Sequence, residues 1–376
     1  MTDIGLQDVF SPTTRATDKM MTLLKEDTVS QITVDSYDRV IFIDHKGPQF
    51  ADRMFATPGE YLEFCNHLLR ITDAGVRDIH GCEMSVIEGS FNPDLTNVHG
   101  SIHILTSELT GGEPALTIRK QPLTVLTLDQ MLSQAMMNTD MRLFLEQAVR
   151  GRSNILVSGG SGAGKTTLAR ALSMFVDPWH RVVTCEEIDE LHLRDRLHDV
   201  VRTTTFRKRD ERGCLLREVT LDDLVRESLR MRPDRVWVGE TRGKEAYALV
   251  KAANSGHDGC VTTLHADNGK QAIKQLITYV MESGLPETVA RQQVAQAFHI
   301  VVQVSKLRMQ RRVITEISYL EPVIENHTEQ RITPLWKYNP ETDTHEKTMI
   351  SPPKRLMEHW SNHGVNYDPS PHPQHL

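Results

Sequence analysis

The sequence of 376 residues contains no long apolar segment. Its longest candidates, such as Val40–Ile43 and Ile300–Val304, are far shorter than the ~18 residues of a membrane-spanning helix and have the length of buried strands. The first ten residues, MTDIGLQDVF, lack the basic and apolar regions of a signal peptide. The sequence therefore predicts a protein that has no membrane span and is not secreted.

Cysteine is scarce. The five cysteines stand at positions 65, 82, 185, 214 and 260, an odd number without a C-x-x-C pair. This usage argues against a disulfide framework and against a cysteine zinc site, and it favours a reducing cytoplasm.

An excess of basic residues is also missing, since 43 lysines and arginines face 50 acidic residues, a net charge of −7. This balance disfavours a nucleic-acid coat protein, although it allows a local basic patch. The hydrophobic share of 39% and the charged share of 25% are those of an ordinary globular chain. Disorder throughout is therefore excluded.

The N-terminal third predicts a small α+β domain. Residues 1–28 are polar and mixed and predict a flexible arm, whereas residues 29–121 combine hairpin and helix signals. Apolar residues alternate between Ile32 and Phe42, as in a β-hairpin. The stretch Thr57-Pro58-Gly59-Glu60 has the form of a helix start.

The remainder predicts an α/β domain. Helix starts near Thr127 and Thr139 indicate a helical linker over residues 122–150. Strand and helix signals then alternate over residues 151–350, which predicts a predominantly parallel sheet covered by helices. Residues 351–376 are rich in proline and histidine and predict a disordered tail. Its histidines, at positions 359, 363, 372 and 375, are expected to be solvated rather than ligands.

The strongest motif follows the first strand of this second domain. It reads Gly159-Gly160-Ser161-Gly162-Ala163-Gly164-Lys165-Thr166 and matches G-x-x-x-x-G-K-[ST] between a predicted strand and a predicted helix. Glycines allow backbone N–H groups to surround phosphate oxygens, and the helix directs its positive end at the same anion. The lysine can reach the β- and γ-phosphates, and the threonine hydroxyl can hold Mg²⁺. The motif predicts ATP and Mg²⁺ as cofactors.

Acidic residues follow two further strands. Val236-Trp237-Val238-Gly239-Glu240 ends in a carboxylate, and Glu186, Glu187 and Glu190 follow another apolar run. Because strand C-termini meet at the ligand crevice of a parallel sheet, Glu240 is expected to face the phosphates and to orient water or hold Mg²⁺. Without the glycine loop, an ordinary solvated acidic turn would be the better interpretation.

Two further groups leave alternatives open. His257 and His265 bracket the run Cys260–Leu264, and each is either a hydrogen-bonded structural residue or a sensor of the γ-phosphate. The basic segment with Arg207, Arg209 and Arg212 is either a solvated loop or the source of an arginine for the phosphates of a neighbouring subunit.

Four stretches together resemble the type II/type IV secretion ATPase superfamily, the traffic ATPases, and most closely its VirB-type secretion/conjugation and Tad-pilus members. They are NILVSGGSGAGKTT, LRMRPDRVWVGETRG, SGHDGCVTTLHADN and LTIRK, within about residues 30–320. The resemblance implies a RecA-like ATPase domain over residues 151–350. It also implies a cytoplasmic homohexamer, peripheral at the inner membrane face, that contacts inner-membrane components of the apparatus and a coupling protein.

The resemblance also implies roles for single residues. Lys165, Thr166 and Thr167 would serve the phosphates with the glycine loop, Glu240 would position water, and Arg119 of the LTIRK stretch would bring the N-terminal domain to the nucleotide. Further catalytic positions are implied by the family's acidic box, its histidine box and its phosphate-contacting arginine: Glu186, Glu187, Glu190, His257, His265 and Arg207. The implied Mg²⁺ ligands are Thr166, Glu187 and Glu240.

The resulting hypothesis is an ATP-hydrolysing hexameric motor of a type IV secretion or related pilus system. A RecA-like DNA translocase and a nucleotide-binding scaffold of the same machine are the alternatives. The absence of a basic and aromatic strand-binding surface in the sequence disfavours the translocase.

Overall fold

The computed structural model describes residues 15–44, 46–76, 78–79, 86–91, 96, 98–121, 126–193, 199–209, 215–308, 311–323, 330–349 and 351–368. The chain forms two compact units. The N-terminal unit comprises Met1–Thr124 with Phe206–Val219, and the second unit comprises Val125–Thr205 with Thr220–Leu376. Each unit is described by itself.

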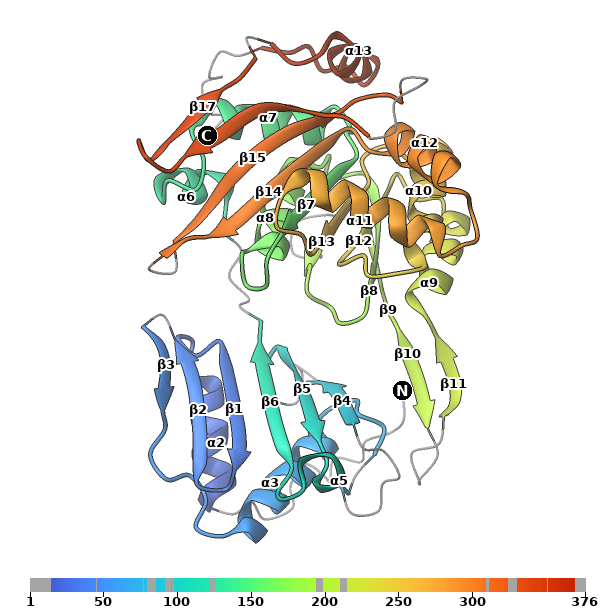
Figure 1. Cartoon of the computed structure of the whole chain (residues 1–376). Helices are drawn as coiled ribbons and strands as arrows, with labels where there is room; N and C mark the ends of the chain where they lie inside the picture. The colour runs from blue at the N-terminus through green and yellow to red at the C-terminus, as the bar shows by residue number, and fades with distance from the viewer. Residues whose placement is uncertain are drawn as a thin grey trace. The chain divides into compact units, whose positions relative to one another are not determined.

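The N-terminal unit contains a six-stranded sheet of order β3-β2-β1-β6-β5-β4, in which every pairing is antiparallel (Figure 1). The strands are β1 Gln31–Ser36, β2 Arg39–Asp44, β3 Gly47–Phe50, β4 Val86–Ser90, β5 Gly100–Leu105 and β6 Ala115–Lys120. Helices α2 Arg15–Lys25 and α3 Pro58–Ile71 share its apolar core, and α5 Ser107–Thr110 is a single turn. At the start of α3, the Thr57 side chain accepts from the backbone N–H of Glu60, as the sequence predicts.

The predicted flexible arm is wrong for residues 15–25. They form helix α2, whose Met20 and Leu24 are fully buried in the core of this unit. The segment is mostly polar, so its few apolar residues at helical spacing were not recognised as the buried face of a helix. Residues 1–14 of the predicted arm lie outside the described residues.

A two-stranded hairpin, β10 Phe206–Arg209 with β11 Leu215–Val219, also belongs to the N-terminal unit. This hairpin contains Arg207 and Arg209, for which the sequence left a solvated loop as one alternative. The guanidinium of Arg207 lies 2.8 Å from Glu218 Oε1 across the hairpin and 3.6 Å from Glu88 Oε2. The side chain of Arg207 is thus held by two carboxylates of its own unit.

The second unit is built on a nine-stranded sheet of order β17-β16-β15-β14-β7-β13-β12-β8-β9 (Figure 1). The strands from β14 to β9 are parallel, whereas β14 to β17 pair antiparallel. The strands are β7 Ile155–Gly159, β8 Arg181–Glu186, β9 Asp199–Thr204, β12 Arg235–Val238, β13 Val261–Leu264, β14 Ile300–Lys306, β15 Arg312–Leu320, β16 Ile332–Asn339 and β17 Thr344–Lys347.

Helices cover both faces of this sheet (Figure 1). The helices are α6 Leu128–Ser133, α7 Thr139–Arg150, α8 Lys165–Leu172, α9 Leu221–Ser228, α10 Glu245–Asn254, α11 Gly269–Met281, α12 Glu287–Ala297 and α13 Lys354–Asn362. Strand β7 shows the alternation that makes this possible, because Ile155 and Val157 enter the core with α6, α7, α8 and α13, whereas Leu156 enters the core with α9 to α12. Among the described residues, no helix is both long and apolar enough to cross a bilayer.

The predicted helical linker and the predicted disordered tail both differ from the structure. The helices of the predicted linker over residues 122–150 are core elements of the second unit, with Met131 and Phe144 buried in it. The predicted disordered tail is wrong for residues 354–362, which form α13 with Leu356 and Trp360 buried. Proline content obscured this pair of apolar residues at helical spacing. Residues 369–376 lie outside the described residues.

Candidate active site

The glycine loop joins β7 to α8 at the carboxyl edge of the parallel strands. Gly162 and Gly164 have φ values of 68° and 99°, a left-handed backbone that favours glycine. A Cβ on Gly159 would lie 2.3 Å from the carbonyl oxygen of Val304 on the neighbouring strand. The loop therefore needs glycine both for its turn and for its close approach to β14. Of the other loop residues, Ala163 is buried, whereas Gly160 and Ser161 are exposed.

Lys165, at the first position of α8, is 7% exposed and folds back over the loop. Its ammonium donates to the carbonyl oxygens of Gly159 and Gly160, each at 3.1 Å. A third contact, also at 3.1 Å, joins it to Nδ1 of His265, which follows β13. Residues a hundred positions apart are thus brought together at the edge of two adjacent parallel strands.

His265 connects the lysine to Glu240. An ammonium only donates, so Nδ1 of His265 accepts from Lys165, and Nε2 is the ring nitrogen that contacts Glu240. That Nε2 is 2.9 Å from Oε1 of Glu240, which comes two residues after β12. A lysine, a histidine and a glutamate from the ends of three neighbouring parallel strands form one continuous polar chain.

Arg242 extends this chain and was not singled out from the sequence. Its guanidinium lies 2.8 Å from Oε2 of Glu240 and 2.8 Å from Oε2 of Glu187. Burial lowers the pKa of Arg242, but the hydrogen bond that it donates to Glu240 and the charges of both carboxylates outweigh it and raise that pKa above its usual value. The signal available in the sequence was a basic residue only two positions after Glu240, close enough to pair with that carboxylate.

Glu186 is the most buried carboxyl group of the site, with 1% of its surface exposed. Its Oε1 accepts from the backbone N–H groups of Glu190 and Leu191 at 3.0 Å, whereas Oε2 is buried without a hydrogen-bond partner. Burial, together with the charge of Asp189, raises the pKa of Glu186 to about 8. Glu186 therefore shapes the loop that presents its acidic neighbours.

The predicted Mg²⁺ ligands are only partly brought together. The Thr166 hydroxyl lies 3.2 Å from Oε2 of Glu190, which the sequence had placed among the catalytic positions but not among the metal ligands. Glu187 and Glu240 are instead linked through Arg242. Carboxylate and hydroxyl oxygens are the donors that Mg²⁺ accepts, so Thr166 with Glu190 fits that ion.

Other predicted residues lie elsewhere. His257 precedes β13, at the end of the strand opposite His265, and its Nδ1 contacts the hydroxyl of Ser255 at 3.2 Å. Arg119 lies on β6, and Arg207 and Arg209 lie on β10, all in the N-terminal unit. Arg212 is outside the described residues. Thr167 follows Thr166 on α8, partly buried.

Arg312 is a further residue that sequence reasoning missed. It begins β15, and its Nε donates to the carbonyl oxygen of Gly162 at 3.2 Å. Its side chain also lies against Gly164. No local pattern marked this arginine, since its contact with the loop depends on the antiparallel return of β15.

Solved structures show the same fold. The ATPase DotB of Legionella pneumophila superposes with a TM-score of 0.56 at 19% identity and covers 84% of this chain and 84% of its own. The pilus retraction motor PilT with bound ADP gives a TM-score of 0.54 at 16% identity, again over 84% of each chain.

Curated relatives are similar in sequence over shorter segments. A putative conjugal transfer protein of Mycobacterium tuberculosis is 38% identical over 172 residues, 46% of this chain and 47% of the relative. The type IV secretion system protein VirB11 of Bartonella quintana is 33% identical over 196 residues, 51% of this chain and 53% of its own. An uncharacterized protein of Methanocaldococcus jannaschii is 33% identical over 248 residues, which are 63% of this chain but 32% of that protein. The chain therefore spans about a third to a half of these relatives.

The model of the type II/IV secretion system protein family matches residues 95–342, which include the glycine loop and every residue of the polar chain from Lys165 to Arg242. This match covers more than half of the sequence, and the resemblance found from its motifs is thereby confirmed. The chain belongs to the type II/IV secretion system protein family.

Proposed function

We propose that this protein is an ATP-hydrolysing motor of a type IV secretion or related pilus system. The observation that carries the proposal is the continuous contact from Lys165 through His265 to Glu240, at the carboxyl edge of three adjacent parallel strands. A phosphate-binding lysine and a water-positioning carboxylate are the two groups that nucleotide hydrolysis requires at one place. The same contact can report the presence of a γ-phosphate.

The glycine loop supplies the phosphate cradle. Its N–H groups and the first turn of α8 favour an anion at this position. Lys165 now donates to the neutral carbonyl oxygens of Gly159 and Gly160. Phosphate oxygens are charged and make stronger bonds with an ammonium, so ATP draws the lysine away from these carbonyl groups. Thr166 and Glu190 would hold Mg²⁺, which when bound would supply charge neutralisation at the phosphates.

Displacement of Lys165 then affects Glu240. His265 then loses the ammonium at Nδ1, and that nitrogen can take up a proton from water and donate it as a hydrogen bond to the γ-phosphate. Glu240 is held at its other oxygen by Arg242, which keeps the carboxylate oriented while its Oε1 accepts from water. Glu240 thereby orients the nucleophile for attack on the γ-phosphate.

Assembly is the second part of the proposal. The family relationship favours a homohexamer, cytoplasmic and peripheral at the inner membrane, in contact with inner-membrane components of the apparatus and a coupling protein. In such a ring, Arg207 or its neighbours Arg209 and Arg212 would reach the nucleotide of an adjacent subunit, and Arg119 would bring the N-terminal unit to the nucleotide. Differential contacts with ATP and ADP would then bias the position of that unit.

The test is steady-state ATP hydrolysis by the purified chain, with mass measured by light scattering in the same samples. Glu240→Gln keeps the shape of the side chain and removes its charge, so turnover should fall by about 100-fold or more. Glu341→Gln, on the exposed turn between β16 and β17, is the matched control and should hydrolyse as the wild type does.

Equal hydrolysis by wild type and Glu240→Gln would overturn the assignment of the water-positioning role. Assembly without hydrolysis in either sample would favour the nucleotide-binding scaffold over the motor. Turnover that rises several-fold with added single-stranded DNA would favour the translocase.

A further inference from the structure

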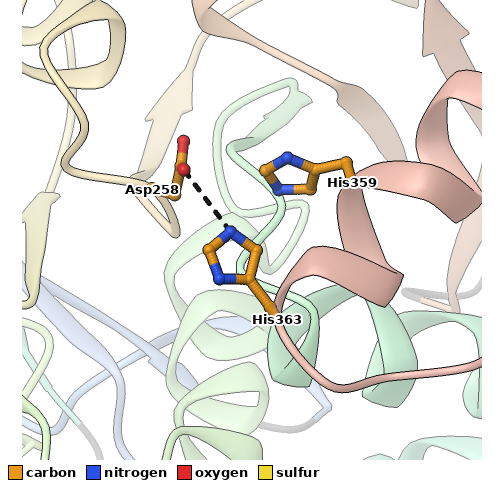
Figure 2. A group of neighbouring side chains, drawn as sticks. All are labelled: Asp258, His359 and His363. Atoms are coloured by element: carbon orange, nitrogen blue, oxygen red, sulfur yellow. Dashed lines mark ion pairs between the residues drawn. The ribbon is translucent and has the colours of Figure 1, made fainter.

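A second group of chemically active side chains lies at the amino edge of the same sheet. Asp258 stands in the loop before β13, and His359 and His363 are four residues apart at the end of α13. One ligand atom from each of the three lies within 4.8 Å of the others. Figure 2 shows the two rings and the carboxylate facing one space between the helix and the loop. Nothing in the proposed motor mechanism uses them.

The spacing suits a small cation. At a metal–ligand distance of 2.0–2.1 Å, tetrahedral zinc separates neighbouring ligand atoms by roughly 3.4 Å. Nε2 of His363 and Oδ2 of Asp258 are already 3.4 Å apart. The ligand atom of His359, within 4.8 Å of both, needs to move by about 1.5 Å or less to close the site. A change of that size is within the reach of a side-chain rotation.

Arg152 holds both halves of the group in place. Its carbonyl oxygen lies 3.2 Å from Nε2 of His359, and its Nε donates to the carbonyl oxygen of Asp258 at 3.3 Å. A carbonyl oxygen only accepts, so Nε2 of His359 carries the proton and Nδ1 carries the lone pair. Donation of one ring N–H to a backbone carbonyl is the arrangement that orients metal-binding histidines.

The surroundings hold the helix and its histidines in place. The ring of His299 packs on His359 with the centroids 4.3 Å apart. Trp360 of the same helix is fully buried and donates to the hydroxyl of Ser153 at 2.7 Å. A helix already in place reduces the entropy cost of binding a metal ion.

We propose that Asp258, His359 and His363 form a binding site for one divalent transition-metal ion, with zinc as its fitting occupant, which fastens α13 to the amino edge of the sheet. Two imidazoles and one carboxylate select zinc or a similar ion over Mg²⁺, which prefers oxygen ligands. The open fourth position would be taken by water, since the Asp258 and His363 side chains retain 29% and 24% of their exposed surface. The site is structural in character, because its ligands join the C-terminal helix to the loop before β13.

The experiment is calorimetric titration of the full chain with Zn²⁺ after chelator treatment, without nucleotide. The wild type should bind one Zn²⁺ per chain, and its thermal midpoint should rise by roughly 5 °C at saturating metal. Asp258→Asn and His363→Gln should each weaken this binding at least tenfold. Both variants are compared with the wild type by circular dichroism without metal, which shows whether they are folded.

Two controls match the variants. His103 pairs with Glu88 at 3.2 Å, a histidine–carboxylate pair of the same kind as His363 with Asp258, and His103→Gln should leave zinc binding unchanged. The double change His372→Ala with His375→Ala removes the other histidines near the C-terminus and should also leave it unchanged. Absence of stoichiometric binding in the wild type, or an equal loss in a control, would overturn the proposal. Equal binding of Mg²⁺ would overturn the ligand chemistry assigned to the site.

Discussion

The two edges of the second unit's parallel sheet carry different kinds of polar groups. At the carboxyl edge, Lys165, Glu240 and Arg242 are charged groups linked to one another, directly or through His265. At the amino edge, Asp258 and two imidazoles face a shared space. Strand β13 separates the two, with Asp258 before it and His265 after it.

This difference follows from what each edge is built on. The carboxyl edge is next to a helix N-terminus and a glycine loop, so it favours an anion, and its lysine contacts the loop's own carbonyl oxygens. The amino edge is covered by α13, and its groups are donors for a cation. The proposed phosphate site and the proposed metal site thus lie at opposite edges of one sheet and have no residue in common.

The largest effect is expected from loosening α13 from the amino edge of the sheet. Trp360 is fully buried, and its ring lies 5.4 Å from that of Phe144, so Trp360→Ala should lower the free energy of unfolding by about 3–5 kcal/mol. Urea unfolding followed by circular dichroism measures this. Trp179, which is 78% exposed, is the matched control, and Trp179→Ala should cost less than about 0.5 kcal/mol. Similar losses in the two variants would contradict the docking of α13.

A smaller effect separates the two histidines that bracket β13. His265→Ala removes a hydrogen bond to a charged lysine, and kcat for ATP should fall about tenfold. His257 lies at the opposite end of the strand, and His257→Ala should change kcat less than twofold in the same assay. Equal losses would show that His257 acts on a nucleotide, which the geometry within one chain does not provide.

The smallest effect concerns the buried carboxyl group of the carboxyl edge. The folded-state pKa of Glu186, about 8, lies above that of an unfolded glutamate, so the stability it contributes is present at low pH and is lost as the pH rises through 8. Glu186→Gln should therefore be more stable than the wild type by about 1 kcal/mol at pH 9, and the difference should vanish near pH 4. Urea unfolding at the two pH values measures it, and a difference that grows toward low pH would reverse the assignment.

Most of the central fold was predictable because its signals are local. The glycine loop, the apolar run before Glu240 and the helix start at Thr57 each depend on residues close together in the sequence. The nine-stranded order was not predictable, since it depends on pairings such as β14 with β7, which are far apart along the chain. Helix α12 and strands β16 and β17 were missed because they lack strong periodicity.

The site shows the same division. Lys165 and Glu240 could be predicted from motif and strand position, whereas the partner of Thr166 could not. Glu190 reaches that hydroxyl because the loop after β8 is shaped by Glu186. The side chain of Glu186 also packs closely on Gly239, where a Cβ would lie 3.0 Å from it. His359 and His363 were expected to be solvated because Asp258, which the fold brings beside them, is about a hundred residues away in the sequence.

Hydrogen exchange of the full chain, with a non-hydrolysable ATP analogue plus Mg²⁺ or with Zn²⁺ alone, tests most directly whether the two edges act separately. The account predicts that the nucleotide slows exchange over residues 159–168 and around 240–242, and that Zn²⁺ slows it around 258 and 359–363. Each ligand should leave the other edge unchanged. Slower exchange at the amino edge with the nucleotide would contradict the account. Exchange at the glycine loop that is the same with and without the nucleotide would also contradict it.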